Sequence, residues 1–160
     1  MKTLVIYYSL EGNTKLIAET IAKETNADIL ELKTKKEYPT GRFKKYLWGG
    51  KSVLLNQKPD LLEIDLDPNE YDRIFIGTPI WVGTYAPPFN TFIENCNIEN
   101  KKICLFACHG GGGAKKFYTN FKNKLPNNEY IGEIDFLEPV KKNTEESLIQ
   151  VRVWINNLKS

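Results

Sequence analysis

The hydrophobic positions of this chain change period several times along its length. Five short runs rich in β-branched and aromatic residues are nearly continuous, which is typical of strands covered on both faces. These predicted strands span about residues 3–8, 28–32, 72–78, 102–108 and 130–136. Apolar residues at helical spacing predict helices over about residues 14–26, 88–95, 114–125 and 144–158. We expect the strand over residues 72–78 to stop at Pro79, which lacks a backbone N–H.

Strands that alternate with helices predict an α/β fold with a doubly wound, five-stranded parallel sheet and helices on both faces. The 160 residues are enough for one domain, 1–160, with a full core. Three cysteines without a C-x-x-C pair, and a single histidine, favour neither a disulfide framework nor a metal site. The amino-terminal sequence has no signal-peptide pattern and no apolar run approaches a membrane span, so we expect a cytoplasmic protein without membrane insertion.

Ligands of such sheets bind beyond the carboxyl ends of the strands, which selects residues 9–14, 79–85 and 108–113. Residues 9–14 are rich in small hydroxyl and amide side chains around Gly12, as a loop that wraps a phosphate requires; a turn without a ligand is the alternative. No G-x-G-x-x-G motif is present. The segment from Gly49 to Ser52 imitates the end of a Walker A loop, but Lys45 replaces its opening glycine, so we exclude nucleoside triphosphates.

The loop S-L-E-G-N-T, residues 9–14, resembles the phosphate loop of flavodoxins. T-P-I-W-V-G, residues 78–83, is similar to the flavin-flanking loop of that family, and the element order matches over the whole chain. The resemblance implies a flavodoxin-like fold that holds FMN noncovalently. The cofactor-binding residues that it implies are Ser9, Leu10, Glu11, Gly12, Asn13, Thr14, Thr78, Pro79, Ile80, Trp81, Val82, Gly83, Tyr85, Cys108, His109, Gly110, Gly111 and Gly112.

In this resemblance the hydroxyl and amide groups of residues 9–14 hold the phosphate, and Trp81 flanks the flavin ring with Tyr85 as a second aromatic candidate. A carboxylate would repel a phosphate, so we expect the side chain of Glu11 to point to solvent. The loop over residues 108–113 has no aromatic residue for the second ring face. That face is open, or Trp48 or Tyr46 covers it. Adjacent residues at a strand end point to opposite sides, which argues against a nucleophile–base pair of Cys108 and His109, although His109 could hydrogen-bond the flavin.

Charge is distributed unevenly along the chain. Residues 33–58 contain eight basic residues and one acidic residue, a net +7, whereas the rest contains 14 basic and 19 acidic residues, a net −5. This segment is either a solvated helix and loop or a patch that steers an anionic substrate or an acidic partner.

The sequence favours an FMN-binding electron carrier in electron transport, with redox partner proteins. The alternative is an oxidoreductase, an FMN-dependent NAD(P)H reductase of quinones or similar small-molecule acceptors. Two features favour the reductase: the open ring face, and the sequence pI near 8.3, since the resemblance implies strongly acidic carriers. We identify no catalytic residues and no metal ligands. A receiver domain is disfavoured because the strand before Ser9 ends without an acidic pair for magnesium. No nucleic-acid-binding motif accompanies the basic residues.

Overall fold

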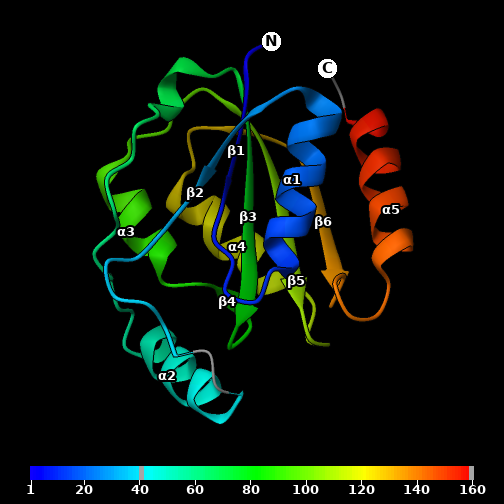
Figure 1. Cartoon of the computed structure of the whole chain (residues 1–160). Coiled ribbons are helices and arrows are strands. Elements are labelled where there is room, and N and C mark those ends of the chain that lie inside the picture. The colour runs from blue at the N-terminus through cyan, green and yellow to red at the C-terminus, as the bar shows by residue number, and fades with distance from the viewer. Residues whose placement is uncertain (40–41, 159–160) are drawn as a thin grey trace.

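The computed structural model of the chain describes residues 1–39 and 42–158, and for residues 42–46 it describes the backbone but not the side chains. Five parallel strands form the sheet, in the order β2-β1-β3-β5-β6 (Figure 1). They are β1 (Thr3–Tyr7), β2 (Asp28–Glu31), β3 (Arg73–Trp81), β5 (Lys102–His109) and β6 (Glu129–Leu137). The two-residue β4 (Thr84–Tyr85) folds back antiparallel on the end of β3. The doubly wound α/β sheet predicted from the sequence is confirmed.

Helices cover both faces of this sheet. One face packs against α1 (Asn13–Thr25) and α5 (Thr144–Asn157), and the other against α3 (Pro88–Asn95) and α4 (Lys115–Lys124). A short 3₁₀ helix spans Pro68–Glu70. The helix α2 (Arg42–Leu54) lies apart from these layers, beside the edge where the strands end (Figure 1). No helix in the described part of the chain is long and apolar enough to cross a membrane.

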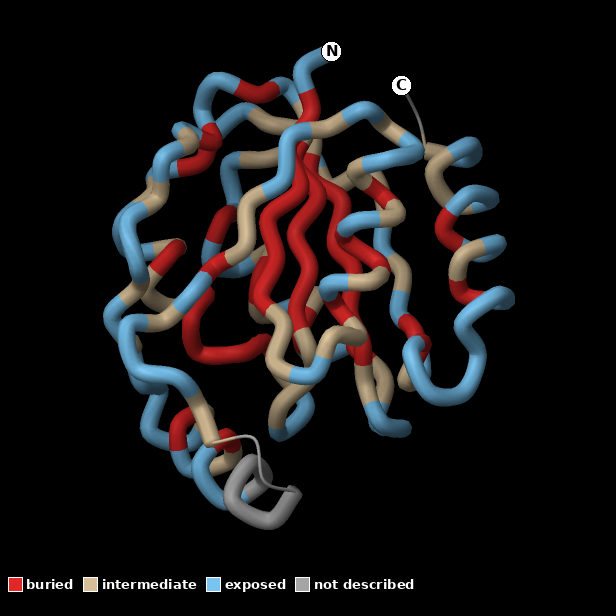
Figure 2. Tube along the Cα trace, in the orientation of Figure 1, coloured by how far each residue is buried: buried red, intermediate tan, exposed pale blue. Residues whose placement is uncertain are grey.

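The core consists of two apolar clusters, one on each face of the sheet. Val5 and Phe75 face α1 and α5, whereas Leu4 and Ile74 face α3 and α4, because successive residues of a strand point to opposite faces. All four side chains are fully buried, and the central strands form the buried part of Figure 2. Continuous apolar runs in the sequence therefore correspond to strands covered on both faces.

The prediction that Pro79 ends its strand is wrong. β3 continues to Trp81, and Pro79 pairs in register with Cys108 of β5. The pairing of β3 with β1 ends at Gly77, so beyond that residue β3 is an edge strand on this side, where a missing N–H is tolerated. The extension carries the Trp81 side chain beyond the end of β1.

Gly77 is a packing constraint in the centre of the sheet. A Cβ at this position would overlap the fully buried ring of Phe106 on the neighbouring strand. We expect Gly77→Ala to lower the free energy of unfolding by about 1–3 kcal/mol, measured by urea denaturation, because an overpacked core must shift side chains or backbone.

Gly112→Ala is the matched control, since a Cβ there meets no atom within 4 Å. Its free energy of unfolding should stay within about 0.5 kcal/mol of the wild type. Equal effects of the two substitutions would contradict the packing explanation.

Candidate functional site

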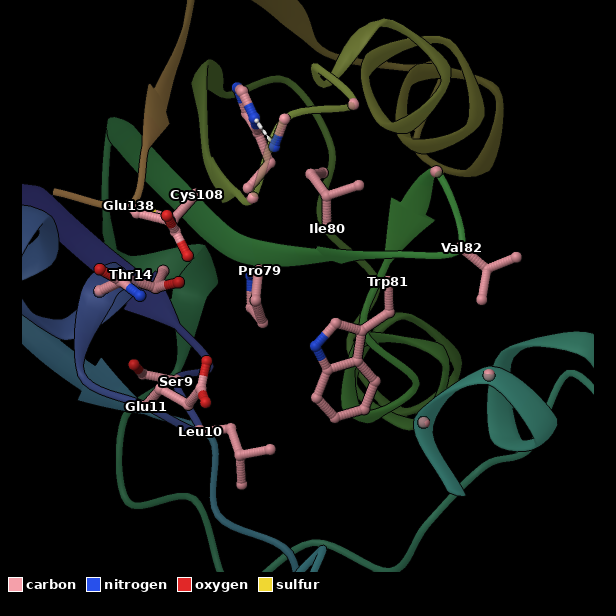
Figure 3. A pocket seen from close by; sticks show the side chains of 18 residues that line it. Ser9, Leu10, Glu11, Thr14, Pro79, Ile80, Trp81, Val82, Cys108 and Glu138 are labelled. Carbon is pink, nitrogen blue, oxygen red and sulfur yellow. Dashed lines mark hydrogen bonds between the residues drawn. The ribbon is translucent and has the colours of Figure 1, made fainter. Parts of the chain in front are cut away.

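A cavity of about 370 Å³ opens at the carboxyl edge of the sheet, a volume typical of sites for small cofactors. The three loops that follow β1, β3 and β5 meet there with α2 (Figure 3). Its lining residues are Ser9, Leu10, Glu11, Asn13, Thr14, Gly49, Gly50, Pro79, Ile80, Trp81, Val82, Gly83, Cys108, His109, Gly110, Gly111, Gly112 and Glu138.

The amino terminus of α1 forms one wall of this pocket. Gly12 precedes the helix in the left-handed conformation, with φ of 90°, and its N–H donates to Oγ of Ser9 at 3.2 Å. No side chain that the structure describes caps the helix, and no acidic residue lies in its first turn. The first N–H groups and the positive end of the helix dipole are thus available to an anion in the pocket.

Thr14 supplies an unsatisfied polar group at the same place. Thr14 is 1% exposed, and its Oγ1 has no hydrogen-bond partner among the described residues. The Cys108 thiol is close to this hydroxyl, but a thiol is only a weak hydrogen-bonding group. A buried hydroxyl without a partner is costly, so this atom indicates a polar ligand in the pocket.

The other predicted side chains of this loop lie differently. Asn13 lines the pocket, but its Oδ1 accepts a hydrogen bond from the N–H of Val140 at 3.0 Å, which joins α1 to the segment after β6. Glu11 is exposed, as its charge led us to expect, although it also borders the pocket. Glu138 was not predicted; it reaches the pocket with a positive φ of 41° just after β6.

Trp81 is held by two tyrosines and by α2. Its half-buried ring makes edge contacts with Tyr8, at a centroid distance of 5.8 Å, and with Tyr38, at 5.1 Å. The hydroxyl of Tyr38 hydrogen-bonds Oγ of Ser52 in α2 at 3.1 Å. These contacts fix the ring on the side of the pocket opposite Thr14 (Figure 3).

Gly49 and Gly50, rather than an aromatic residue, bring α2 to the pocket. A Cβ on Gly49 would lie 3.4 Å from Cε3 of Trp81, so the helix backbone passes the ring with the space of about one methyl group between them. Trp48 does not line the pocket; it is 57% exposed on the other side of α2. The side chain of Tyr46 lies outside the described residues. The sequence analysis missed both glycines as site residues.

His109 directs its ring nitrogens to protein groups. Nδ1 accepts from the N–H of Gly111 at 3.1 Å, and Nε2 lies 2.7 Å from Oδ2 of Asp135. An accepting Nδ1 places the proton of the neutral ring on Nε2, which donates to Asp135. Tyr118 donates to the other carboxylate oxygen at 3.3 Å, and burial, aided by Asp135, raises its pKa. The histidine therefore shapes the glycine loop.

Cys108 is not an activated nucleophile. Its side chain is 3% exposed, and burial raises the pKa of the thiol to about 12. The neutral thiol dominates at physiological pH, and His109, occupied by Gly111 and Asp135, does not act as its base. The geometry agrees with the expectation that these neighbours form no catalytic pair.

Three predicted contact residues lie outside the pocket lining. Gly12 forms the turn behind it. Thr78 is buried, and its Oγ1 accepts from the N–H of Ala86 at 3.0 Å, which holds the loop after β3. The ring of Tyr85 packs in the core against Phe117 and Phe121 rather than at the pocket. The other fifteen predicted residues are brought together.

Comparison with known proteins gives a consistent result. Residues 2–158 match the Flavodoxin family model. The flavodoxin-like domain-containing protein BilS of Clostridioides difficile is 31% identical over 137 residues, and the match covers 82% of this chain and 63% of that protein. The chain thus spans less than two thirds of the length of BilS.

Solved structures share the fold. A flavoprotein of Lactobacillus acidophilus, crystallised in complex with FMN, is 27% identical and superposes with a TM-score of 0.73 over 89% of this chain and 98% of its own. A protein of Bacteroides uniformis, 24% identical, has a TM-score of 0.83 over 98% of both chains.

Removal of the imidazole should loosen the glycine loop. We expect His109→Phe to raise the hydrogen-exchange rate of the Gly111 amide about fivefold, because one hydrogen bond is worth about 1 kcal/mol. The control is Tyr118→Phe, which removes a contact with Asp135 but keeps the bond between His109 and Gly111. An unchanged exchange rate in His109→Phe would show that the imidazole does not hold the loop.

Proposed function

The chain belongs to the flavodoxin family, and we propose that it binds FMN noncovalently in this pocket and carries electrons between redox partners. The observation that carries the proposal is the buried, unpartnered Oγ1 of Thr14 beside the uncapped amino terminus of α1. A phosphate group would satisfy the hydroxyl, the free N–H groups and the helix dipole together. The FMN complex of the Lactobacillus acidophilus relative supports the same ligand.

The opposite side of the pocket suits an aromatic ring system. Trp81, Pro79 and Ile80 provide apolar surface, and the tyrosines behind Trp81 keep its ring in place. The exposed glycines at positions 110–112 let backbone groups approach a polar ring edge closely, with His109 fixing their conformation. These residues would bind and orient the cofactor and exclude water from one side of it.

Bound FMN supplies one- and two-electron redox chemistry, and the chain's own groups tune it through stacking, charge and hydrogen bonds. The Cys108 thiol stays protonated, and His109 is committed to Gly111 and Asp135. Neither residue is placed to give or take a proton from a substrate. This inertness supports a carrier, in which protein partners exchange electrons with the cofactor.

A second candidate is an FMN-dependent NAD(P)H reductase of quinones or similar acceptors. It is favoured by the exposed glycines 110–112 after β5, which offer no aromatic ring to cover a second flavin face. Space on that side would admit a nicotinamide or a small acceptor.

Spectroscopy followed by kinetics tests both candidates. The purified protein should show the visible absorption bands of oxidised flavin, and mass spectrometry of the released cofactor should identify FMN. A protein that takes up no flavin when FMN is added would overturn both candidates. Rapid NAD(P)H oxidation with a quinone acceptor would favour the reductase, and its absence in a protein that holds FMN would favour the carrier.

Loss of the Thr14 hydroxyl should weaken FMN more than riboflavin. A hydrogen bond to a charged group is worth about 1.5–3 kcal/mol, so Thr14→Ala should raise the Kd of FMN roughly ten- to a hundredfold. Riboflavin has no phosphate, and its Kd should change little. Fluorescence titration of both flavins measures the difference.

Thr20→Ala in the same helix is the matched control, because its hydroxyl donates to the carbonyl of Leu16 away from the pocket. It should leave the Kd of FMN unchanged. Equal losses of FMN and riboflavin in Thr14→Ala would remove Thr14 from the phosphate site.

Truncation of Trp81 should affect both flavins equally. Trp81→Ala removes apolar and π contact, and the Kd of FMN and riboflavin should each rise about tenfold. The reduction potential of bound FMN should rise, because an electron-rich neighbour disfavours added negative charge. Trp154→Phe is the control, since that indole packs on Phe75 in the other core cluster. Unchanged affinities and potential in Trp81→Ala would separate Trp81 from the flavin.

A further inference from the structure

The helix α2 buries small residues and exposes large apolar ones. Its inner side, toward Trp81 and Tyr38, carries the small buried residues Gly49 and Ser52. Large apolar side chains lie on the outside: Leu47, Trp48, Leu54 and Leu55, just after the helix, are 64%, 57%, 77% and 59% exposed. A helix that packs only against its own domain shows the opposite pattern.

The apolar side chains form one surface, together with Lys51. At about 100° per residue, Leu47, Trp48, Lys51, Leu54 and Leu55 fall within an arc of roughly 120° around the helix axis. We call these five residues the outer face of α2. Such a contiguous exposed apolar surface marks an interaction site.

All charged residues in the segment around α2 are basic. Residues 38–59 contain five cations, Arg42, Lys44, Lys45, Lys51 and Lys58, and no acidic residue. Lys58 pairs with Glu94 at 2.8 Å, whereas no described residue forms an ion pair with Lys51. The apolar outer face therefore has a cation at its centre and a basic segment before it.

We propose that the outer face of α2 binds the anionic surface of a lipid bilayer. Trp and Leu side chains enter the boundary between headgroups and acyl chains, and Lys side chains reach the anionic headgroups from the same helix. The contact is interfacial and involves no membrane-spanning segment. The outer face does not overlap the pocket, because none of the five residues lines it.

Charge disfavours a second copy of this chain as the occupant. A two-fold contact between two outer faces would bring Lys51 of one copy toward Lys51 of the other, with no acidic residue between positions 38 and 59 to separate them. An anionic bilayer complements the same charge. Because Gly49 and Gly50 line the pocket from the inner side, the bilayer would lie about one helix diameter, ~10 Å, from the pocket wall.

Vesicle flotation of the FMN-loaded protein tests the proposal. The probes are vesicles of phosphatidylcholine alone and vesicles with about 30% phosphatidylglycerol. The wild type should bind the anionic vesicles at low salt, bind the neutral vesicles much more weakly, and lose most binding at about 0.5 M salt.

Substitutions separate the apolar and the electrostatic contributions. The double variant Trp48→Ser with Leu54→Ser removes two inserted side chains. It should weaken binding to the anionic vesicles at least roughly tenfold. Lys51→Glu removes one positive charge and adds one negative charge, each worth about fivefold near such a surface, so it should weaken binding roughly 25-fold. The control is Ile149→Ser/Val153→Ser on α5, where the side chains are 58% and 54% exposed; it should bind as the wild type does.

Flavin absorbance and circular dichroism of each variant show whether it is folded and loaded, so loss of vesicle binding is distinguished from loss of FMN. Three results would overturn the proposal: no binding of the wild type to anionic vesicles, full binding by the α2 variants, or equal losses in the α5 control. If the wild type binds no vesicles and light scattering gives twice the mass of one chain, the outer face is a self-association surface. One that binds only an acidic redox protein would assign it to a protein partner.

Discussion

All five parallel strands end at one edge of the sheet, and the pocket depends on that constraint. Parallel pairing places the loops after β1, β3 and β5 side by side. In the sequence, the loop after β1 is about 70 residues from the loop after β3 and about 100 residues from the loop after β5. The tight contact of Gly77 with Phe106 keeps β3 close to β5 just before the loops diverge. Edge and register together set the distance between the α1 terminus and Trp81.

The site retains polar groups that the chain itself does not satisfy. The Thr14 hydroxyl and the first turn of α1 would each be more stable with a partner, and a folded protein rarely leaves such groups buried without one. Elsewhere around the pocket the polar groups are paired: His109 with Asp135 and Gly111, and Asn13 with Val140. The unsatisfied Thr14 hydroxyl and the uncapped helix terminus therefore lie where an anion would bind, and the paired groups keep the surrounding loops in shape.

Local signals predicted the strands and three of the pocket loops, because each loop interrupts a periodic pattern with glycine, proline or small polar residues. The same rule failed at Pro79, where the absence of a neighbouring strand on one side permits a proline that a central strand would exclude. Gly49, Gly50 and Glu138 reach the pocket only through tertiary packing, for which the sequence holds no local signal. The orientation of His109 likewise depends on Asp135, 26 residues away on a neighbouring strand.

Trp81 belongs to two structures at once, since its ring borders the pocket and also supports the backbone of α2 at Gly49. A ligand that pushed the ring toward α2 would press on the helix, because only about the space of one methyl group separates the ring from the backbone at Gly49. Thermodynamic linkage makes such an effect reciprocal: whatever factor pocket occupancy imposes on the affinity of α2 for a bound surface, that surface imposes on the pocket. If the outer face of α2 binds a surface, the indole is the side chain through which heterotropic coupling with the pocket would pass, across the thickness of a single helix.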